Sequence, residues 1–260
     1  MTEPANVGRR KWLQGAIAAA GGCALSACDR IAQSERVNST LDWAEGWTHR
    51  VQRLLLGRKA LAREYSDEDI SRDFRANGTT NPDTDEYNAL LRTGFADWRL
   101  AVGGLVERPL QLSLAQLRQL PARTQITRHD CVEGWSCIAK WSGARLSSVL
   151  QRAGLKPEAK FLAFHCADSL ELALDGTGQY YETIDLVDAL HEQTILAYDM
   201  NGQPLGVAHG APLRLRLERQ LGYKMAKYVM RIEAIDNFSG LGRGKGGYWE
   251  DRGYQWYAGI

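Results

Sequence analysis

Alternating hydrophobic and polar positions dominate the second half of the chain and predict a series of short strands. The strands expected from this alternation are residues 98–104, 109–114, 124–131, 161–166, 170–174, 195–198, 213–217 and 228–235. Apolar positions at helical spacing predict short helices at residues 114–120, 146–153 and 186–191. Because these helices do not alternate regularly with the strands, the pattern indicates an α+β domain with a mixed sheet.

The first third of the chain has a different pattern. Residues 38–65 place apolar side chains at the spacing of an amphipathic helix, which we expect to pack against the domain; they are Leu41, Trp47, Val51, Leu54, Leu55 and Leu61. Residues 67–85 are polar and rich in turn-forming residues, which predicts a long loop of the kind that often lines a site. We therefore divide the chain into a targeting segment (1–28), a helix and loop segment (29–96) and a single catalytic domain (97–260).

The charges are nearly balanced, with 32 Lys and Arg against 31 Asp and Glu. No overall field would therefore attract nucleic acid or an anionic membrane, and any anion site must be local. The hydrophobic content of 44% is ordinary for a globular protein. The composition is therefore that of a globular protein with no charge-driven affinity for nucleic acid.

The N-terminus resembles an export signal. The pair Arg9-Arg10 precedes a weakly hydrophobic stretch, Gly15 to Ala27, that is too short for a membrane span. A twin-arginine signal exports folded proteins, as a cofactor inserted in the cytoplasm requires, so we expect the protein on the periplasmic side of the inner membrane. The sequence before Cys28 also resembles a lipoprotein box, which predicts a lipid anchor at Cys28; ordinary cleavage just before it is the alternative.

Three cysteines remain after this segment, namely Cys131, Cys137 and Cys166. An odd number leaves at least one thiol unpaired or bound to a metal. A disulfide between Cys137 and Cys166 would suit an oxidising compartment, but the spacing leaves that pairing open.

The chemistry is concentrated around Cys131, which has His129 and Asp130 before it and Glu133 after it. A thiolate is a nucleophile or a ligand for a thiophilic metal, and its surroundings decide which. Against the simple interpretation of a buried, inert cysteine, this one has an imidazole and two carboxylates beside it. The residues alone therefore mark 127–136 as the candidate site.

Three other interpretations of these residues stay open at this point. His129, on the same strand face as Cys131, could act as the base for a nucleophilic Cys131 in an enzyme without metal. A zinc site could form from His129, Cys131, His165 and Cys166. A non-enzymatic exported lipoprotein could instead bind a partner through the aromatic tail at residues 247–257.

Three motifs in order resemble the sulfite oxidase family of molybdopterin-dependent oxidoreductases, and most of all its exported bacterial branch that contains the catalytic subunit of periplasmic methionine sulfoxide reductase. They are His129 to Ser136, Gly210 to Arg214, and Gly222 to Lys224. The resemblance spans about residues 97–235 and implies the mixed-sheet fold of that family. The residues after Cys131 lack the Ala-Gly-Asn-Arg pattern of animal and plant sulfite oxidases, so the resemblance favours a reductase over a sulfite-oxidising enzyme, which is the alternative.

The resemblance also implies roles for particular residues. Cys131 would be the one protein thiolate ligand of a molybdenum-molybdopterin cofactor, because a soft thiolate suits a sulfur-ligated metal. Glu133 matches the acidic residue two places after the cysteine in the reductase-like branch, and its position near Cys131 predicts a catalytic role as a proton relay. The positions that would bind the cofactor are Asn77, Cys166, His209, Arg214, Met225, Ala226 and Lys227. His209 and Cys166 depart from the Asn and Thr of the reductase subunit, which puts these two contacts in doubt.

The implied reaction is oxygen-atom transfer to or from a small substrate, with sulfoxide or another S- or N-oxide reduction as the expected direction. The sequence has no haem or ferredoxin cysteine motif, so electrons would come from a separate partner, a membrane cytochrome b or a quinone-linked protein. We expect a monomer apart from that partner, since nothing after the aromatic tail corresponds to the dimerisation domain of longer relatives.

Overall fold

The computed structural model describes residues 34, 43, 46–54, 57–171 and 178–260. The chain separates into two compact units, Met1–Leu55 and Leu56–Ile260. The predicted targeting segment, with Cys28, lies outside the described residues. Among the described residues, no helix is both long enough and apolar enough to cross a bilayer.

Residues 46–54 are helical, as the amphipathic pattern predicts, and Trp47, Val51 and Leu54 on this helix are exposed. The prediction that the helix continues to residue 65 is wrong. Gly57 has a φ of +65°, a left-handed conformation that is common where helices end. Beyond it the chain is extended enough for Glu64 to bridge to Thr127.

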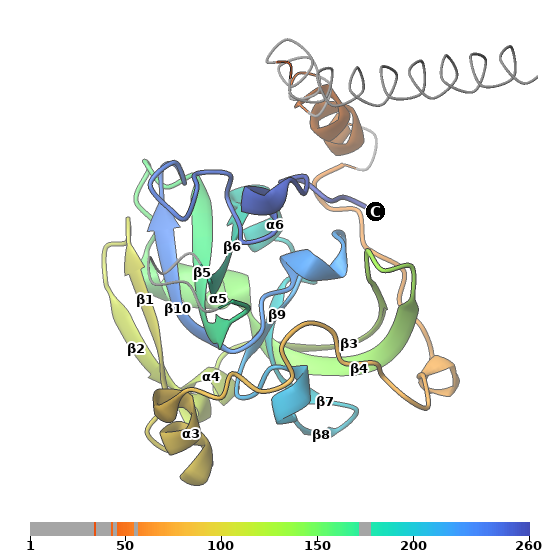
Figure 1. The fold of residues 1–260 in the computed structure, drawn as a ribbon, viewed down its shortest axis with the longest axis vertical. Coiled ribbons are helices and arrows are strands. Elements are labelled where there is room, and N and C mark those ends of the chain that lie inside the picture. Colours follow the sequence, from red (N-terminus) through yellow and green to blue (C-terminus); the bar gives the residue numbers. More distant parts are fainter. Residues whose placement is uncertain (1–33, 35–42, 44–45, 55–56, 172–177) are drawn as a thin grey trace, which may run out of the picture. The chain divides into compact units, whose positions relative to one another are not determined.

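Two five-stranded sheets form the unit Leu56–Ile260 (Figure 1). The first has the order β2-β1-β10-β5-β6. Its strands are β1 (Arg99–Gly104), β2 (Leu110–Ser113), β5 (Phe161–Ser169), β6 (Gln179–Asp185) and β10 (Val229–Ile235). Strands β1 and β10 run parallel and the other pairs antiparallel, so the sheet is mixed.

The second sheet has the order β3-β4-β7-β8, with β9 paired to β7, and all its pairs are antiparallel. Its strands are β3 (Ala122–Asp130), β4 (Ser136–Arg145), β7 (Ile195–Met200), β8 (Gln203–Pro204) and β9 (Arg214–Arg216). The long hairpin of β3 and β4 therefore delivers the Cys131 segment at its turn (Figure 1).

Short helices connect the strands. They are α3 (Asp85–Arg92), α4 (Leu114–Arg118), α5 (Leu146–Ala153), α6 (Leu186–Ala189) and the 3-10 turns η1 (Asp67–Asp69), η2 (Val207–His209), η3 (Gly222–Lys224) and η4 (Glu250–Arg252). Ser113 and Gln116 form a capping box at the start of α4. Gly154, at φ +72°, ends α5 at the position that the sequence predicts.

One hydrophobic core joins the two sheets and α5. Leu146 and Leu150 of α5, Phe164 of β5 and Ile232 of β10 are at most 1% exposed and belong to it. Burying each of these side chains contributes about 1.5–3 kcal/mol relative to leaving it exposed. The same cluster contains Leu196 of β7 and Leu215 of β9, so the second sheet packs against the first through this core.

The α+β fold with a mixed sheet is confirmed, but several elements were missed. Helix α3 follows the predicted loop, in a stretch for which no helix was expected; β4 and β8 were not predicted, and β6 lies after the predicted strand 170–174. Leu170 and Glu171 of that predicted strand are not in a strand, and residues 172–177 lie outside the described part of the chain. Burial alternates along the middle of β4, where Ala139, Trp141 and Gly143 are buried and their neighbours are half-buried. The strand escaped prediction because two of these buried residues are small and do not stand out as apolar positions in the sequence.

A buried ion-pair cluster anchors the aromatic tail. The Lys224 ammonium lies 2.5 Å from Glu182 of β6 and 2.5 Å from Glu250 of η4, and all three side chains are almost fully buried. Burial and the neighbouring Glu250 raise the pKa of Glu182 well above its usual range, although Lys224 opposes the shift. Because Glu250 directly follows Trp249, the cluster holds the tail segment that supplies Trp249 and Tyr254 to the wall of the pocket described below.

The start of η3 packs against β3 with no room for a side chain at Gly222. A Cβ there would lie 2.4 Å from the His129 ring. His129 is itself fully buried. Only glycine therefore allows η3 to approach the strand that leads to Cys131.

Replacing Lys224 with Met should leave two buried carboxylates without a counter-charge. We expect the free energy of unfolding to fall by about 3–5 kcal/mol, the usual cost of removing one partner of a buried ion pair. Urea unfolding followed by circular dichroism measures it. The matched change Lys156→Met, at an exposed lysine, should stay within about 0.5 kcal/mol of the parent; equal losses in the two variants would contradict a central role for the cluster.

Replacing Gly222 with Ala should force η3 and His129 apart. We expect a loss of about 1–3 kcal/mol in the free energy of unfolding, as for other overpacked positions. Gly103→Ala is the control, because a Cβ at Gly103 would meet nothing within 4 Å. Thermal or urea unfolding of both variants measures the loss. A G222A protein as stable as G103A would show that η3 and the His129 ring can move apart at little cost.

Candidate functional site

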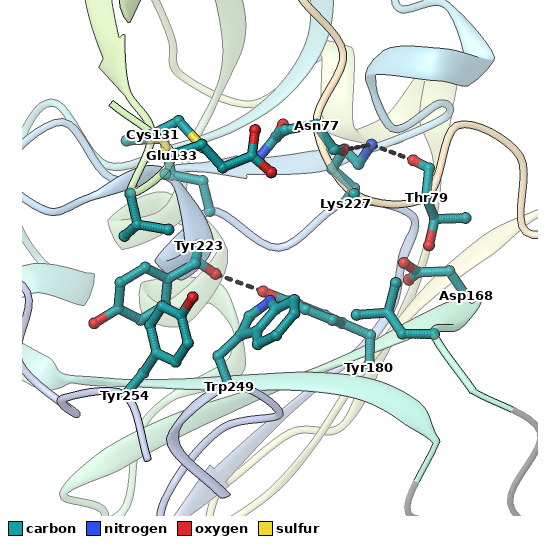
Figure 2. A pocket seen from close by; sticks show the side chains of 15 residues that line it. Asn77, Thr79, Cys131, Glu133, Asp168, Tyr180, Tyr223, Lys227, Trp249 and Tyr254 are labelled. Carbon is teal, nitrogen blue, oxygen red and sulfur yellow. Dashed lines mark hydrogen bonds between the residues drawn. The ribbon is translucent and has the colours of Figure 1, made fainter. Parts of the chain in front are cut away.

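One pocket gathers most of the chemically active side chains (Figure 2). It is lined by Asn77, Gly78, Thr79, Cys131, Val132, Glu133, Asp168, Leu170, Tyr180, Gly222, Tyr223, Met225, Lys227, Trp249 and Tyr254. These residues come from the 67–85 loop, the β3–β4 turn, β5, β6, η3 and the tail. The long loop predicted to line a site therefore does so.

Cys131 lies one residue beyond β3, in the tight turn to β4. Its N–H donates to the Trp135 carbonyl at 3.0 Å, and the Gly134 N–H donates back to the Cys131 carbonyl at 3.0 Å. The prediction of Cys131 as the last strand residue, sharing a face with His129, is therefore wrong by one residue, because Gly134 at φ +85° closes the turn earlier. The turn directs the thiol to the pocket instead of the sheet.

The thiol of Cys131 has a raised pKa in the protein without ligand. Burial is the main cause, and the nearby Glu133 charge adds to it, while the Glu133 backbone N–H and Arg75 oppose it. The thiol therefore stays protonated at neutral pH unless something else draws off its proton. Binding to a metal ion would do that.

Glu133 lies at the rim of the pocket beside Cys131. The Trp135 indole N–H donates to its carboxylate at 2.9 Å, and the Arg75 guanidinium lies 4.0 Å from the same oxygen. The Glu133 side chain is 59% exposed, so it can exchange protons with solvent. Its position suits a proton carrier between water and the interior of the pocket.

Lys227 ties the long loop to the rest of the site. Its ammonium donates to the Asn77 carbonyl at 2.7 Å, to the Thr79 carbonyl, and to the Ala208 carbonyl at 3.2 Å. Burial and then the Arg214 charge lower the pKa of Lys227 to about 7. An anion placed against this group would stabilise its charged form.

Arg214 carries unused hydrogen-bond donors in the interior. One of its terminal nitrogens donates to the His209 carbonyl at 3.0 Å, whereas Nε and the other terminal nitrogen have no partner. His209 Nδ1 is likewise buried without a partner. Arg214 is 1% exposed, and burial followed by the Arg216 charge lowers its pKa to about 9. Strand arginines are usually solvated, so this burial calls for an anionic ligand.

The other predicted cofactor-binding residues lie at different depths. Met225 lines the pocket, Ala226 is fully buried with its carbonyl bound to the Leu215 N–H at 2.8 Å, and Cys166 is buried on β5. Burial raises the pKa of the Cys166 thiol well above its usual range. Five of the predicted residues line one pocket, namely Asn77, Cys131, Glu133, Met225 and Lys227. The roles assigned to all nine stay predictions.

Two alternatives drawn from the residues lose support. His129 Nδ1 lies 3.1 Å from Arg216, and burial and then Arg216 lower its pKa well below the usual range; its described contacts include none with the Cys131 thiol. His129 belongs to one sheet, whereas His165 and Cys166 belong to the other. No three His, Cys, Asp or Glu side chains among the described residues are grouped to hold a metal ion, so the proposed four-residue zinc site is wrong.

The cysteines after the targeting segment are all free thiols. Cys137 is on β4 and Cys166 on β5, in different sheets. The disulfide that the spacing left open is therefore not formed in this structure.

Asp168 and the aromatic wall of the pocket were missed from the sequence. Asp168 follows Cys166 by two residues, and both side chains are buried, so strand alternation could have placed them on one face of β5. Tyr180, Trp249 and Tyr254 gave no such signal, because the pocket brings together strands and a tail that are distant in the sequence.

The donor set fits a phosphorylated, sulfur-ligated cofactor. Buried polar groups are nearly always hydrogen-bonded, so the unused N–H groups of Arg214 and the free Nδ1 of His209 indicate a ligand that satisfies them. Together with Lys227 they would hold a phosphate, and Lys227 and the Cys131 thiol line one pocket. The chain thus offers cationic donors and one thiolate, the two kinds of group that molybdopterin would need.

Comparison with known proteins agrees with this fit. Residues 88–240, more than half of the chain, match the oxidoreductase molybdopterin binding domain. A putative protein-methionine-sulfoxide reductase subunit, YedZ1, of Azospira oryzae is 36% identical over 251 residues, which cover 96% of this chain and 87% of the relative.

The catalytic subunit MsrP of protein-methionine-sulfoxide reductase is 33% identical in Xanthomonas axonopodis pv. citri, over 59% of this chain and 49% of the relative. The chain thus spans about half the length of that subunit. The sulfane dehydrogenase SoxCD of Paracoccus pantotrophus has a TM-score of 0.48 and 26% identity, over 54% of this chain and 39% of that structure.

The family match rests on the segment that carries Cys131, Arg214 and Lys227, and it agrees with the mixed-sheet fold observed here. The chain therefore belongs to the family of the oxidoreductase molybdopterin binding domain, the sulfite oxidase family that its motifs indicate, and it is an oxidoreductase enzyme.

Proposed function

We propose that the protein is an exported molybdenum-molybdopterin enzyme that reduces a sulfoxide or a related S- or N-oxide with electrons from a membrane cytochrome b or quinone-linked partner. The relatives named as methionine-sulfoxide reductase subunits support the reaction. The observation that carries it is the pocket itself, in which the Cys131 thiol and the Glu133 carboxylate lie side by side (Figure 2).

When bound, the molybdenum centre would supply oxygen-atom transfer and the storage of two electrons. Cys131 would hold the metal as its thiolate, which requires that the thiol lose the proton that burial favours. Arg214 and His209 would bind the phosphate with the donors that are unused without it. Lys227 would add charge from the side of the long loop.

Glu133 would deliver the protons that this reaction consumes. Reduction of a sulfoxide consumes two protons and two electrons and yields a sulfide and water. Glu133 is largely exposed and lies two residues from Cys131, so it can take protons from solvent and pass them to the departing oxygen. The Trp135 indole N–H fixes its orientation.

The charges around the pocket favour a neutral or cationic substrate over sulfite. Glu133 and Asp168 both line it, and the charge of the lining lysine, Lys227, would be taken up by the cofactor phosphate. Arg75 at the rim lies near Glu133. A sulfite anion would meet repulsion from the two carboxylates, whereas a neutral sulfoxide would not.

The proposed place of action is the periplasmic face of the inner membrane, reached by twin-arginine export and kept by a lipid on Cys28. Support comes from the sequence of residues 1–28 and from residues 46–63, which contain five cationic and no acidic residues. Helical residues in this stretch expose Trp47 and Leu54. A basic segment with exposed apolar side chains suits contact with an anionic lipid surface.

Replacing Cys131 with Ser should remove the metal ligand. We expect the molybdenum content per chain to fall by at least about tenfold, and with it the rate of sulfoxide reduction driven by a reduced viologen dye. Elemental analysis and a dye-oxidation assay measure the two. Cys137→Ser is the matched control and should retain both; a wild-type protein that is fully active without molybdenum, or that oxidises sulfite and reduces no sulfoxide, would end the proposal.

Replacing Glu133 with Gln should slow proton delivery and leave the cofactor in place. We expect kcat for sulfoxide reduction to fall by about 10²-fold, within the usual contribution of a general acid, with molybdenum content unchanged. The exposed Glu158→Gln is the control. If E133Q keeps its kcat across pH 5 to 8, the proton must reach the pocket by another group.

A further inference from the structure

A second cavity lies beside the pocket of Cys131, and we call it the tail groove. It is lined by Val132, Leu221, Tyr223, Gly253, Tyr254, Gln255, Tyr257, Ala258 and Gly259. Val132, Tyr223 and Tyr254 also line the pocket of Cys131, so the two cavities are neighbours. Figure 2 shows Tyr223 and Tyr254 next to each other, at the end of that pocket away from Asp168.

The side chains shared by the two cavities lie at the surface. Val132 is 43% exposed and Tyr254 is 39% exposed. Exposed apolar side chains that gather beside a site mark a place where apolar surface of a ligand can be buried. A ligand whose reacting group lies beside Cys131 can therefore extend over these side chains into the tail groove.

The tail groove differs from the pocket of Cys131 in its charge. Its side chains are aliphatic, aromatic or, at Gln255, an uncharged amide, and no Asp, Glu, Lys, Arg or His is among the described residues that line it. The pocket of Cys131 is lined by Glu133, Asp168 and Lys227. A charged group would lose hydration in the tail groove without gaining a counter-charge, whereas an apolar group would gain by leaving water.

The walls of the tail groove are tied together. The Leu221 N–H donates to the Ala258 carbonyl at 2.9 Å. The Tyr223 hydroxyl donates to the Gln255 carbonyl at 2.7 Å, and the rings of Tyr223 and Tyr254 pack edge to face with their centroids 5.2 Å apart. Because these contacts form without a ligand, little ordering of the walls would oppose binding.

The tail residues of the groove, 253–259, lie after the segment 88–240 that matches the family domain. Cys131 and Glu133, in contrast, lie within that segment. A wall that stands beside the reacting groups but outside the matched segment suits the selection of a substrate better than the reaction itself.

We propose that the tail groove binds an apolar substituent of the sulfoxide substrate while the sulfoxide group lies in the pocket of Cys131. The inference rests on the proposed function and narrows its substrate class to sulfoxides that carry a bulky, uncharged substituent, such as an aryl methyl sulfoxide. Tyr254 and Tyr257 are then specificity-determining residues, because their rings bury the substituent. Dimethyl sulfoxide has no group that reaches the groove.

The test compares the full-length wild type with Tyr257→Ala, each loaded with its cofactor. Tyr257 lines the tail groove but not the pocket of Cys131. With a reduced viologen dye as electron donor, kcat/KM is measured for methyl p-tolyl sulfoxide and for dimethyl sulfoxide. The ratio of the two values is compared between proteins, since it does not depend on cofactor content. The controls are Tyr257→Phe, which keeps the ring, and Leu190→Ala, at an exposed residue of a different cavity.

We expect Y257A to lower the ratio of aryl to dimethyl sulfoxide about tenfold, mainly through KM for the aryl substrate, which is the usual size of a small apolar contribution to specificity. Y257F and L190A should keep the wild-type ratio. An unchanged ratio in Y257A would overturn the proposal. The same holds if Y257A is impaired only with the membrane electron donor, because the groove would then bind a partner protein.

Binding of the product sulfide tests the groove without turnover. Equilibrium dialysis measures Kd for methyl p-tolyl sulfide, and we expect Kd to be about tenfold higher for Y257A than for wild type. Equal Kd values would overturn the proposal even in a protein that reduces sulfoxides. A wild type that binds the sulfide more tightly than Y257A but reduces no sulfoxide would end the proposed function and leave the groove intact. If Y257A does not fold, Gln255→Glu, which adds a charge at an exposed residue of the groove, should change the ratio and Kd in the same directions.

Discussion

The site depends on one buried ammonium group. Lys227 donates to the carbonyls of Asn77, Thr79 and Ala208, which belong to two segments that are more than one hundred residues apart in the sequence. The loop is also anchored by the Ser71 N–H, which donates to the Ile138 carbonyl at 3.0 Å, so Lys227 chiefly fixes the part of the loop that lines the pocket. Because the three acceptors are neutral, the positive charge of Lys227 is not cancelled, and it remains available to an anionic ligand.

A second constraint is the anchoring of the tail by Lys224. The buried cluster with Glu182 and Glu250 fixes η4, and Trp249 and Tyr254 on either side of η4 then complete the wall of the pocket. The tail is thus part of the pocket wall. Lys224, which holds the tail, and Lys227, which holds the long loop, are only three residues apart. One short segment, residues 224–227, therefore organises both sides of the pocket.

The pocket and the interior behind it contain polar groups that conflict without a ligand. Arg214 has two donors without partners, and Asp168 has an acceptor without one, although both side chains are buried. A protein that did not bind a charged or polar ligand here would gain stability by replacing either residue with an apolar one. The buried donors and acceptors without partners therefore indicate a ligand of the kind that the family binds.

The sequence by itself determined the α+β class, the boundaries of α5, the importance of the Cys131 segment and the family, because helix stops, glycine turns and short motifs are local signals. The tertiary structure decided the rest. Whether Arg214 is solvated or buried depends on what covers β9, and the placement of Cys131 in a turn depends on how β3 pairs with β4. Asp168 became a candidate only when β5, the long loop and the tail met around it, because a pocket is made by contacts between segments that no local pattern records. The roles of the predicted cofactor-binding residues stay predictions, since position alone does not measure binding.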